Sequence, residues 1–171
     1  MRSYNDNHVS IEYLREILCY CPETGALTWK VSKGHRKAGA QAGCVKRTGY
    51  RRIGLGGKSY PEHRIAWAMH YGVWPERDID HINRIGSDNR IANLRLATQS
   101  QNNANQGVYC TNRHGTKGVT PLSSGKWQAQ IQVNGKSHYL GCFKSKDDAA
   151  AAYAKASRRF FGEFSLIGAK P

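Results

Sequence analysis

Two stretches of this 171-residue chain alternate apolar and polar residues, a pattern typical of strands with one buried face. The more regular stretch is residues 126–133, KWQAQIQV. The Asn134-Gly135 pair after it is a strong signal for a hairpin turn into residues 137–143, SHYLGCF. Residues 49–60 form the second candidate hairpin, with Gly56-Gly57 at its turn. We therefore expect at least two small antiparallel sheets.

Capping residues indicate where helices begin. Thr98 followed by Gln101 is a capping-box pair, and the alanine-rich residues 146–161 end at Gly162. Four helices are expected, with first residues at or just after Ser10, Pro61, Thr98 and Ser145.

The order of these elements predicts an α+β chain with two domains. The first spans residues 1–107 and begins with a small β-rich basic region. Residues 108–117, rich in Gly, Thr and Asn, read as a linker. Residues 118–171 are expected to form a three-stranded antiparallel sheet packed on one helix.

The charge of the chain indicates a polyanionic partner. It has 26 Lys and Arg against 12 Asp and Glu, a formal net charge of +14. No acidic residue occurs between Glu23 and Glu62, where basic residues accumulate, so this stretch reads as a phosphate-facing surface. Arg51 and Arg52 are its candidate DNA contacts, although neighbours on a flat strand point to opposite sides. Charge alone would equally suit an RNA-processing or structural nucleoprotein role.

Other features of the sequence indicate the cellular compartment and the state of the cysteines. No apolar run reaches transmembrane length and the N-terminus lacks a signal-peptide core, so a cytoplasmic protein without a membrane partner is expected. The five cysteines form a scattered set, for which reduced thiols are favoured over a structural zinc site. The sequence does not decide between monomer and homodimer.

A run of polar residues carries the candidate chemistry. Metal-assisted phosphodiester hydrolysis needs a base, oxygen ligands for a divalent cation, and a group that orients the base. His81 can be the base, because the ordinary pKa of imidazole lies near neutrality. Asp80 and Asn102 supply the oxygen ligands that Mg²⁺ or Mn²⁺ prefers. Asn93 can hold the imidazole in one tautomer.

This run resembles the HNH nuclease motif of phage and intron homing endonucleases. The likeness lies in DHIN, SDNRIANLRLAT and QNNAN, which follow one another from Asp80. It implies that His81 is the first H and Asn93 the N of the motif. The third position, often His, is Asn102 here, which favours a hard metal over zinc. The resemblance implies a ββα-metal nuclease core and a metal-dependent endonuclease that cuts double-stranded DNA in a phage-infected host cell.

The second domain presents a polar sheet face. Alternation puts Lys126, Gln130 and Gln132 on the face opposite Ile131. A sheet can enter a DNA major groove, where Gln reads adenine edges while Lys and Tyr contact phosphates. An ordinary solvated sheet face accounts for the same pattern.

Residues 118–165 resemble the DNA-binding domain of plant ethylene-response factors, the Apetala-type fold. The likeness lies in GV, GKW, YLG with the following F, and the alanine-rich helix ending at FFGEFS. The family's sheet residues contact bases and phosphates. The matching positions here are Thr120, Gln130, Gln132, Ser137 and Tyr139.

The rival hypothesis is a non-catalytic DNA-binding regulator with a degenerate nuclease motif. A protein that only binds DNA needs none of the four candidate catalytic and metal residues. Their joint presence favours the endonuclease.

Overall fold

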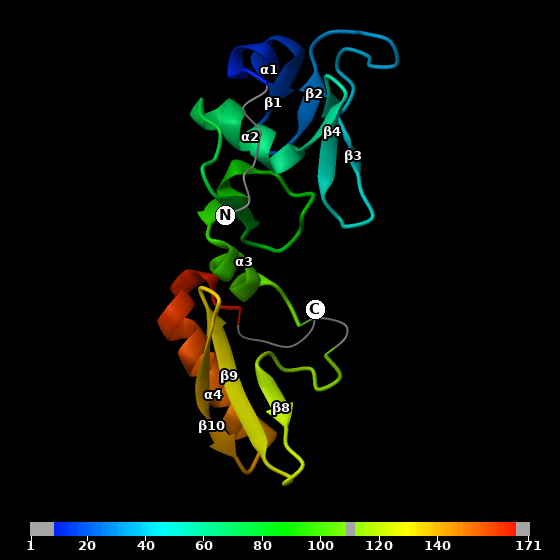
Figure 1. Ribbon diagram of the computed structural model, residues 1–171. Helices are drawn as coiled ribbons and strands as arrows, with labels where there is room; N and C mark the ends of the chain where they lie inside the picture. The colour runs from blue at the N-terminus through cyan, green and yellow to red at the C-terminus, as the bar shows by residue number, and fades with distance from the viewer. Residues whose placement is uncertain (1–8, 109–111, 167–171) are drawn as a thin grey trace. The chain divides into compact units, whose positions relative to one another are not determined.

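The computed structural model describes residues 9–108 and 112–166 (Figure 1). The chain forms two compact units, whose boundary in the sequence falls between Leu96 and Ala97. Each unit has its own hydrophobic core. The α+β prediction is confirmed, because both units combine helices with small sheets. No helix in the described part of the chain is long and apolar enough to cross a membrane.

The first unit contains three small sheets and two helices. Its elements up to the second helix are α1 (Ile11–Ile17), β1 (Leu18–Tyr20), β2 (Leu27–Trp29), β3 (Cys44–Val45), β4 (Arg51–Leu55), β5 (Lys58–Pro61) and α2 (Glu62–Tyr71). Then follow β6 (Asp78–His81), the short 3-10 helix η1 (Ile91–Asn93) and β7 (Leu94–Ala97), whose last residue belongs to the second unit. The sheets are β1-β2, β3-β4-β5 and β6-β7.

Local signals account for these elements. The Ser10 side chain accepts a hydrogen bond from the Tyr13 N–H and caps α1, as predicted. The β4–β5 hairpin turns at Gly56 and Gly57, both of which have the positive φ that glycine adopts without strain. Helix α2 ends at Gly72 in the left-handed conformation. The core of the unit is built from α1, the strands and α2, and it includes Leu14, Leu18, Leu27, Ile53, Leu55 and Ile65.

The second unit is a sheet covered by a long helix. Its elements are α3 (Gln99–Asn105), β8 (Val119–Pro121), β9 (Trp127–Val133), β10 (Lys136–Phe143), α4 (Lys146–Phe161) and the 3-10 helix η2 (Gly162–Phe164). The strand order is β10-β9-β8, all antiparallel, and α4 packs on all three strands (Figure 1). This is the predicted three-stranded sheet on one helix. The predicted hairpin turn also occurs, with positive φ at Asn134 and Gly135.

Helix α3 belongs to the second unit, whereas the domain boundary predicted at residues 108–117 assigned it to the first. Its buried Ala104 packs in one cluster with Ile131 and Phe161. The Lys117 ammonium donates to three carbonyl oxygens at its C-terminal end: Asn103 at 3.0 Å, Ala104 at 2.9 Å and Gln106 at 2.6 Å. The small alanine side chain and this cap hold α3 to residues that follow it in the chain.

Candidate active site

Strand β6 ends in two buried polar residues. Asp80 and His81 are each 4% exposed. A turn follows at once, in which the Arg84 N–H donates to the His81 carbonyl oxygen at 2.9 Å. The strand therefore ends at His81, and both side chains are held inside the first unit.

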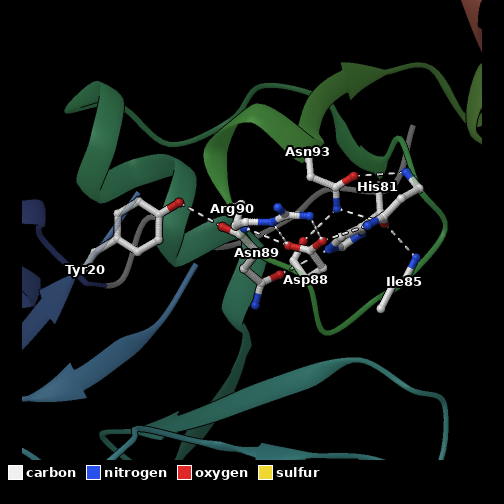
Figure 2. Close-up of polar contacts among 8 residues, drawn as sticks. Tyr20, His81, Ile85, Asp88, Asn89, Arg90 and Asn93 are labelled. Carbon is white, nitrogen blue, oxygen red and sulfur yellow. Dashed lines mark hydrogen bonds and ion pairs between the residues drawn. The ribbon is translucent and has the colours of Figure 1, made fainter. Parts of the chain in front are cut away.

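The His81 imidazole is enclosed by an amide and two rings. Its Nε2 lies 3.1 Å from Oδ1 of Asn89, which is 1% exposed (Figure 2). The Tyr50 and His63 rings meet it edge to face, with centroid distances of 5.6 and 5.2 Å. Burial lowers the pKa of His81, opposed by the Asn89 hydrogen bond and the charges of Asp80 and Asp88. The ring is therefore neutral at neutral pH, which is the form a general base requires.

The Asn93 side chain forms hydrogen bonds with the loop after β6 and not with the His81 imidazole. Its Oδ1 accepts from the Asn83 N–H at 2.9 Å, and its Nδ2 donates to Asn83 Oδ1 at 2.9 Å and to the Asp88 carbonyl at 2.8 Å (Figure 2). The expectation that Asn93 holds the His81 ring is thus revised. The ring contacts Asn89, and Asn93 shapes the loop that carries Asn89. The physical reason is the position of Asn93 at the end of η1, from which its side chain reaches the backbone of the loop. Backbone N–H and C=O groups there need hydrogen-bond partners.

Asp88 provides a second fastening of the same loop. Its carboxylate accepts from Arg90 Nε at 2.8 Å and Nη2 at 2.6 Å, and from Asn83 Nδ2 at 2.7 Å. These hydrogen bonds, with that of Arg90 foremost, lower the pKa of Asp88 to about 2. The carboxylate is therefore ionised at neutral pH and contributes negative potential near His81.

Asp80 is already engaged by a cation. Both Nε and Nη2 of Arg95, on β7, lie 2.9 Å from its Oδ2. Mg²⁺ and Mn²⁺ prefer oxygen ligands, and both the Asp80 carboxylate and the carboxamide oxygen of Asn102 are ligands of this kind. The donor set therefore fits a hard divalent ion, with Arg95 as a neighbour that shares the carboxylate. The described residues contain no group of three or more His, Cys, Asp and Glu that could hold a metal.

Asn102 lies in α3, just past the capping box that the sequence predicted. The Thr98 hydroxyl accepts from the Gln101 N–H at 3.2 Å, and Gln101 Oε1 accepts from the Thr98 N–H at 2.8 Å. Because Asn102 is in the second unit and Asp80 in the first, their joint binding of a metal stays a prediction.

The two candidate arginines of the basic region differ in their placement. Arg51 Nε donates to Glu62 Oε2 at 2.8 Å, and its Nη2 to the Ala42 carbonyl at 2.9 Å. The side chains of Arg51 and Glu62 are 12% and 1% exposed. Arg52 donates to the hydroxyl and carbonyl of Ser59 and is partly exposed. Arg51 is thus committed inside the protein, which leaves Arg52 as the better placed of the two for a phosphate.

The candidate DNA contacts of the second unit share one exposed face. Pairing sets Gln130 opposite Tyr139 and Gln132 opposite Ser137, and directly paired residues point to the same side of a sheet. Thr120 pairs with Gln128, the next position on that face. Ala129 and Ile131, which alternate with the glutamines, are buried toward α4. Six predicted residues are exposed: Thr120, Lys126, Gln130, Gln132, Ser137 and Tyr139.

Four residues of the site carried no local signal in the sequence. Asn89 sits in a run of turn-forming residues, and Glu62 reads as an ordinary acidic residue in the first turn of a helix. Tyr50 and Arg95 reach the site only through pairing of distant segments. Alternation does not reveal such contacts.

Comparison with known proteins identifies the segment that carries the site. Residues 60–104 match a family model described as HNH endonuclease. This segment of the chain is therefore similar to HNH endonucleases. An uncharacterized HNH endonuclease of Acanthamoeba polyphaga mimivirus is 33% identical over 87 residues, which cover 51% of this chain and 44% of the relative. The matched segment includes all four predicted catalytic and metal-binding positions, Asp80, His81, Asn93 and Asn102.

Two plant proteins are similar over shorter stretches. An AP2/ERF and B3 domain-containing transcription repressor of Arabidopsis thaliana is 39% identical over 54 residues, 32% of this chain and 15% of that protein. A transcription factor of the same description and organism is 51% identical over 41 residues, 24% of this chain and 12% of that protein. This chain spans less than half the length of each curated relative.

One solved structure is also similar. It is described as DNA binding and cleavage by the HNH homing endonuclease I-HmuI, at 28% identity and a TM-score of 0.42. The similarity covers 57% of this chain and 56% of that one.

Proposed function

We propose that this protein is a metal-dependent DNA endonuclease that hydrolyses phosphodiester bonds in double-stranded DNA. The observation that carries the proposal is the buried, neutral His81, held through Nε2 by Asn89 and adjacent to the Asp80 carboxylate within the segment similar to HNH endonucleases. A protein that only binds DNA has no use for a desolvated imidazole beside a buried carboxylate. The basic charge of the chain suits the polyanionic substrate.

His81 takes a proton from a water molecule as the water oxygen attacks the scissile phosphorus. The new P–O bond forms as the bond to the 3′ oxygen breaks, and the leaving oxygen acquires a proton. The products are a 5′-phosphate and a 3′-hydroxyl. Asn93 and Asp88 keep the loop in shape during this step, because both form hydrogen bonds that join its two sides.

Asp80 and Asn102 would hold the divalent ion, Mg²⁺ or Mn²⁺. When bound, the ion supplies positive charge that stabilises the leaving 3′ oxygen. Arg95 pairs with the buried Asp80 carboxylate and holds it in place as an oxygen donor. The similarity of this region to HNH endonucleases supports these assignments.

We further propose that the second unit is an Apetala-type module that selects the DNA site. Two observations support it: the similarity to AP2/ERF-containing plant proteins, and the exposed polar face of the sheet opposite α4. Thr120, Gln130 and Gln132 would contact the bases or backbone of the site, with Lys126, Ser137 and Tyr139 beside them. Phosphate contacts supply affinity, and contacts to base edges supply the choice of site.

The decisive experiment measures cleavage of supercoiled plasmid and of phage and host genomic DNA by the full chain. With Mg²⁺ or Mn²⁺ we expect nicked or linear products, and with EDTA none. His81→Ala should lower the rate by on the order of 10²–10⁴ while DNA binding persists. Asp80→Ala should abolish metal-dependent cleavage. His35→Ala, at an exposed histidine of the same unit, is the matched control and should cut as the wild type does.

Three results would reject the proposal. They are wild-type rates from His81→Ala, activity that survives exhaustive chelation, and activity restored by zinc alone. Sequence-selective binding without cleavage under any metal would instead support the non-catalytic DNA-binding regulator.

A further inference from the structure

Asn89 lies between two buried groups that make opposite demands on its amide. On one side, Nε2 of His81 is 3.1 Å from its Oδ1. On the other side is Glu62, 0% exposed; burial raises the pKa of its carboxyl, and the neighbouring Arg51 and Asn89 side chains oppose that rise. Asn89 itself is 1% exposed, so no bulk water competes for either end of the amide.

The chemistry of the two neighbours fixes the orientation of this amide. A carboxylate is an acceptor and favours the NH₂ end of Asn89. The reversed amide would set its oxygen against the carboxylate, two acceptors with no proton between them. Asn89 Nδ2 and Glu62 Oε1 make no hydrogen bond of good geometry with any described residue, so each is the best available partner for the other. The carbonyl end therefore faces His81.

Arg51 pairs with the Glu62 carboxylate and opposes the effect of burial on its pKa. Its guanidinium Nε donates to Oε2 at 2.8 Å, and its Nη2 donates to the carbonyl oxygens of Ala42 at 2.9 Å and Gly43 at 3.5 Å. The ion pair favours the ionised carboxylate, and thereby the orientation of the Asn89 amide. A chain of polar contacts thus runs from Arg51 through Glu62 and Asn89 to His81.

The backbone of Asn89 is anchored by residues that precede the segment similar to HNH endonucleases. The Tyr20 hydroxyl donates to the Asn89 carbonyl at 2.8 Å (Figure 2). The Ile91 N–H donates to the Pro22 carbonyl at 3.1 Å. Gly25 approaches so closely that an added Cβ would lie 2.5 Å from the Asn89 carbonyl carbon. Asn89 is thus held in place at both its backbone and its side-chain amide, which a residue that only forms a turn does not require.

We propose that Asn89 is a positioning residue: through Oδ1 it holds the His81 ring with its proton on Nε2, and Glu62 with Arg51 holds Asn89 in that orientation. An oxygen can only accept, so Nε2 donates and Nδ1 carries the lone pair that takes the proton from water. The inference deepens the proposed endonuclease function, and its catalytic meaning rests on that function.

The test reads the tautomer directly. Full-length protein labelled with ¹⁵N-histidine is studied by long-range ¹H–¹⁵N correlation at one fixed pH above neutrality, and the His81 signals are assigned by their loss in His81→Ala. The wild type should show His81 as the Nε2–H tautomer. Asn89→Leu should convert it to a mixture of tautomers. Asn89→Gln, which keeps both ends of the amide, should retain the Nε2–H form.

Cleavage rates on plasmid DNA complete the test. Asn89→Leu should lower kcat by on the order of 10- to 100-fold with little change in KM for DNA, and Asn89→Gln should recover part of that loss. Asn83→Ala is the matched control: it disturbs the same loop without touching the ring, so the His81 signals should stay those of the wild type.

The inference is overturned if wild-type His81 carries its proton on Nδ1, a result that needs no variant to fold. It is also overturned if Asn89→Leu keeps both the wild-type tautomer and the wild-type rate. If the tautomer depends on Asn89 while the wild type cuts no DNA, the positioning role stands and the proposed function fails.

Discussion

In the first unit the polar side chains around His81 are buried and bonded to one another, whereas the polar face of the second unit's sheet is exposed. Glu62, Asp80, His81 and Asn89 are each at most 4% exposed. Tyr139, by contrast, is 65% exposed. On the exposed face only a 3.4 Å contact between Gln128 and Gln130 joins neighbouring side chains among the described residues. The two regions therefore use polar groups for different purposes.

The difference follows from the energetics of burial. A polar group taken out of water costs free energy unless it finds partners, so buried polar groups that pair with one another become rigid. Such rigidity suits a group that must meet a phosphorus atom in one orientation. Exposed glutamines keep their hydrogen-bonding capacity available, which suits recognition of another molecule. Substitutions in the first cluster should therefore affect stability and rate, and those on the sheet face should affect choice of DNA.

The largest expected effect is a difference in the loss of stability between Arg51→Ala and Arg52→Ala. The sequence pattern alone does not distinguish these two adjacent arginines. Arg51→Ala leaves the Glu62 carboxylate buried without its cation, which should cost about 3–5 kcal/mol of stability. Arg52→Ala removes hydrogen bonds to Ser59 at the surface and should cost less than about 1 kcal/mol. Denaturant unfolding followed by tryptophan fluorescence measures both. Equal losses would show that the Arg51–Glu62 pair is not part of a buried cluster.

A second prediction tests the boundary between the units. Removing residues after Gly107 takes away Ile131 and Phe161, which pack on Ala104, and Lys117, which caps α3. We therefore expect α3 to lose its order and Asn102 its position, with cleavage lower by on the order of 10²-fold.

Lys117→Met in the full chain is a milder change than this truncation, because it removes the cap of α3 and keeps the apolar packing. It should lower cleavage less than the truncation does. If a fragment of residues 1–107 cuts as fast as the full chain, α3 keeps its structure without the residues after Gly107, and the boundary between the units lies after α3.

The sequence predicted those features that neighbouring residues specify. The capping box at Thr98, the two glycine-containing hairpin turns and the alternation of residues 126–133 each follow from spacing alone, and each occurs in the structure. The exposed face of the second sheet was predictable for the same reason, since alternation assigns every second residue to one side.

The sequence did not predict the contacts of the buried cluster. Glu62 and Asn89 come together only because α2 and the loop after β6 pack in one core, and no residue pattern records that distance. Alternation showed that Arg51 and Arg52 point to opposite sides, but only packing against Glu62 decides which of them is buried. The boundary at Leu96 depends on small residues such as Ala104, whose partners are distant in the chain.

The third prediction concerns acid and His63. Burial, followed by the charges of His81, Arg64 and Arg52, lowers the pKa of His63 from 6.5 to about 3. Below pH 6.5 the unfolded chain binds a proton that the folded chain does not, so stability is complete above that pH and is lost as the pH falls toward 3. The slope due to His63 is about 1.4 kcal/mol per pH unit.

His63→Phe should remove this part of the slope and keep the ring packing against Tyr50 and His81. Free energies of unfolding between pH 6.5 and about 4.5 measure it, a window in which Asp88 stays ionised in the folded chain because its pKa is about 2. His35→Gln, at an exposed histidine, should leave the slope unchanged. If His63→Phe and the wild type lose stability in parallel, His63 is not buried in its neutral form.

The smallest effect on stability belongs to the sheet face of the second unit. Replacing Gln130 and Gln132 with Ala should change the free energy of unfolding by less than about 0.5 kcal/mol, because both side chains are exposed. The choice of DNA sequence should nevertheless relax, since one lost bidentate contact to a base is worth about 1–3 kcal/mol of discrimination. Binding to a random-sequence library, compared with Gln41→Ala as an exposed glutamine of the first unit, measures the change. Total affinity and its salt dependence should hardly move, because phosphate contacts supply them. If the double variant keeps its full preference and Arg52→Ala loses it, site recognition lies in the first unit and the exposed glutamines are an ordinary solvated face.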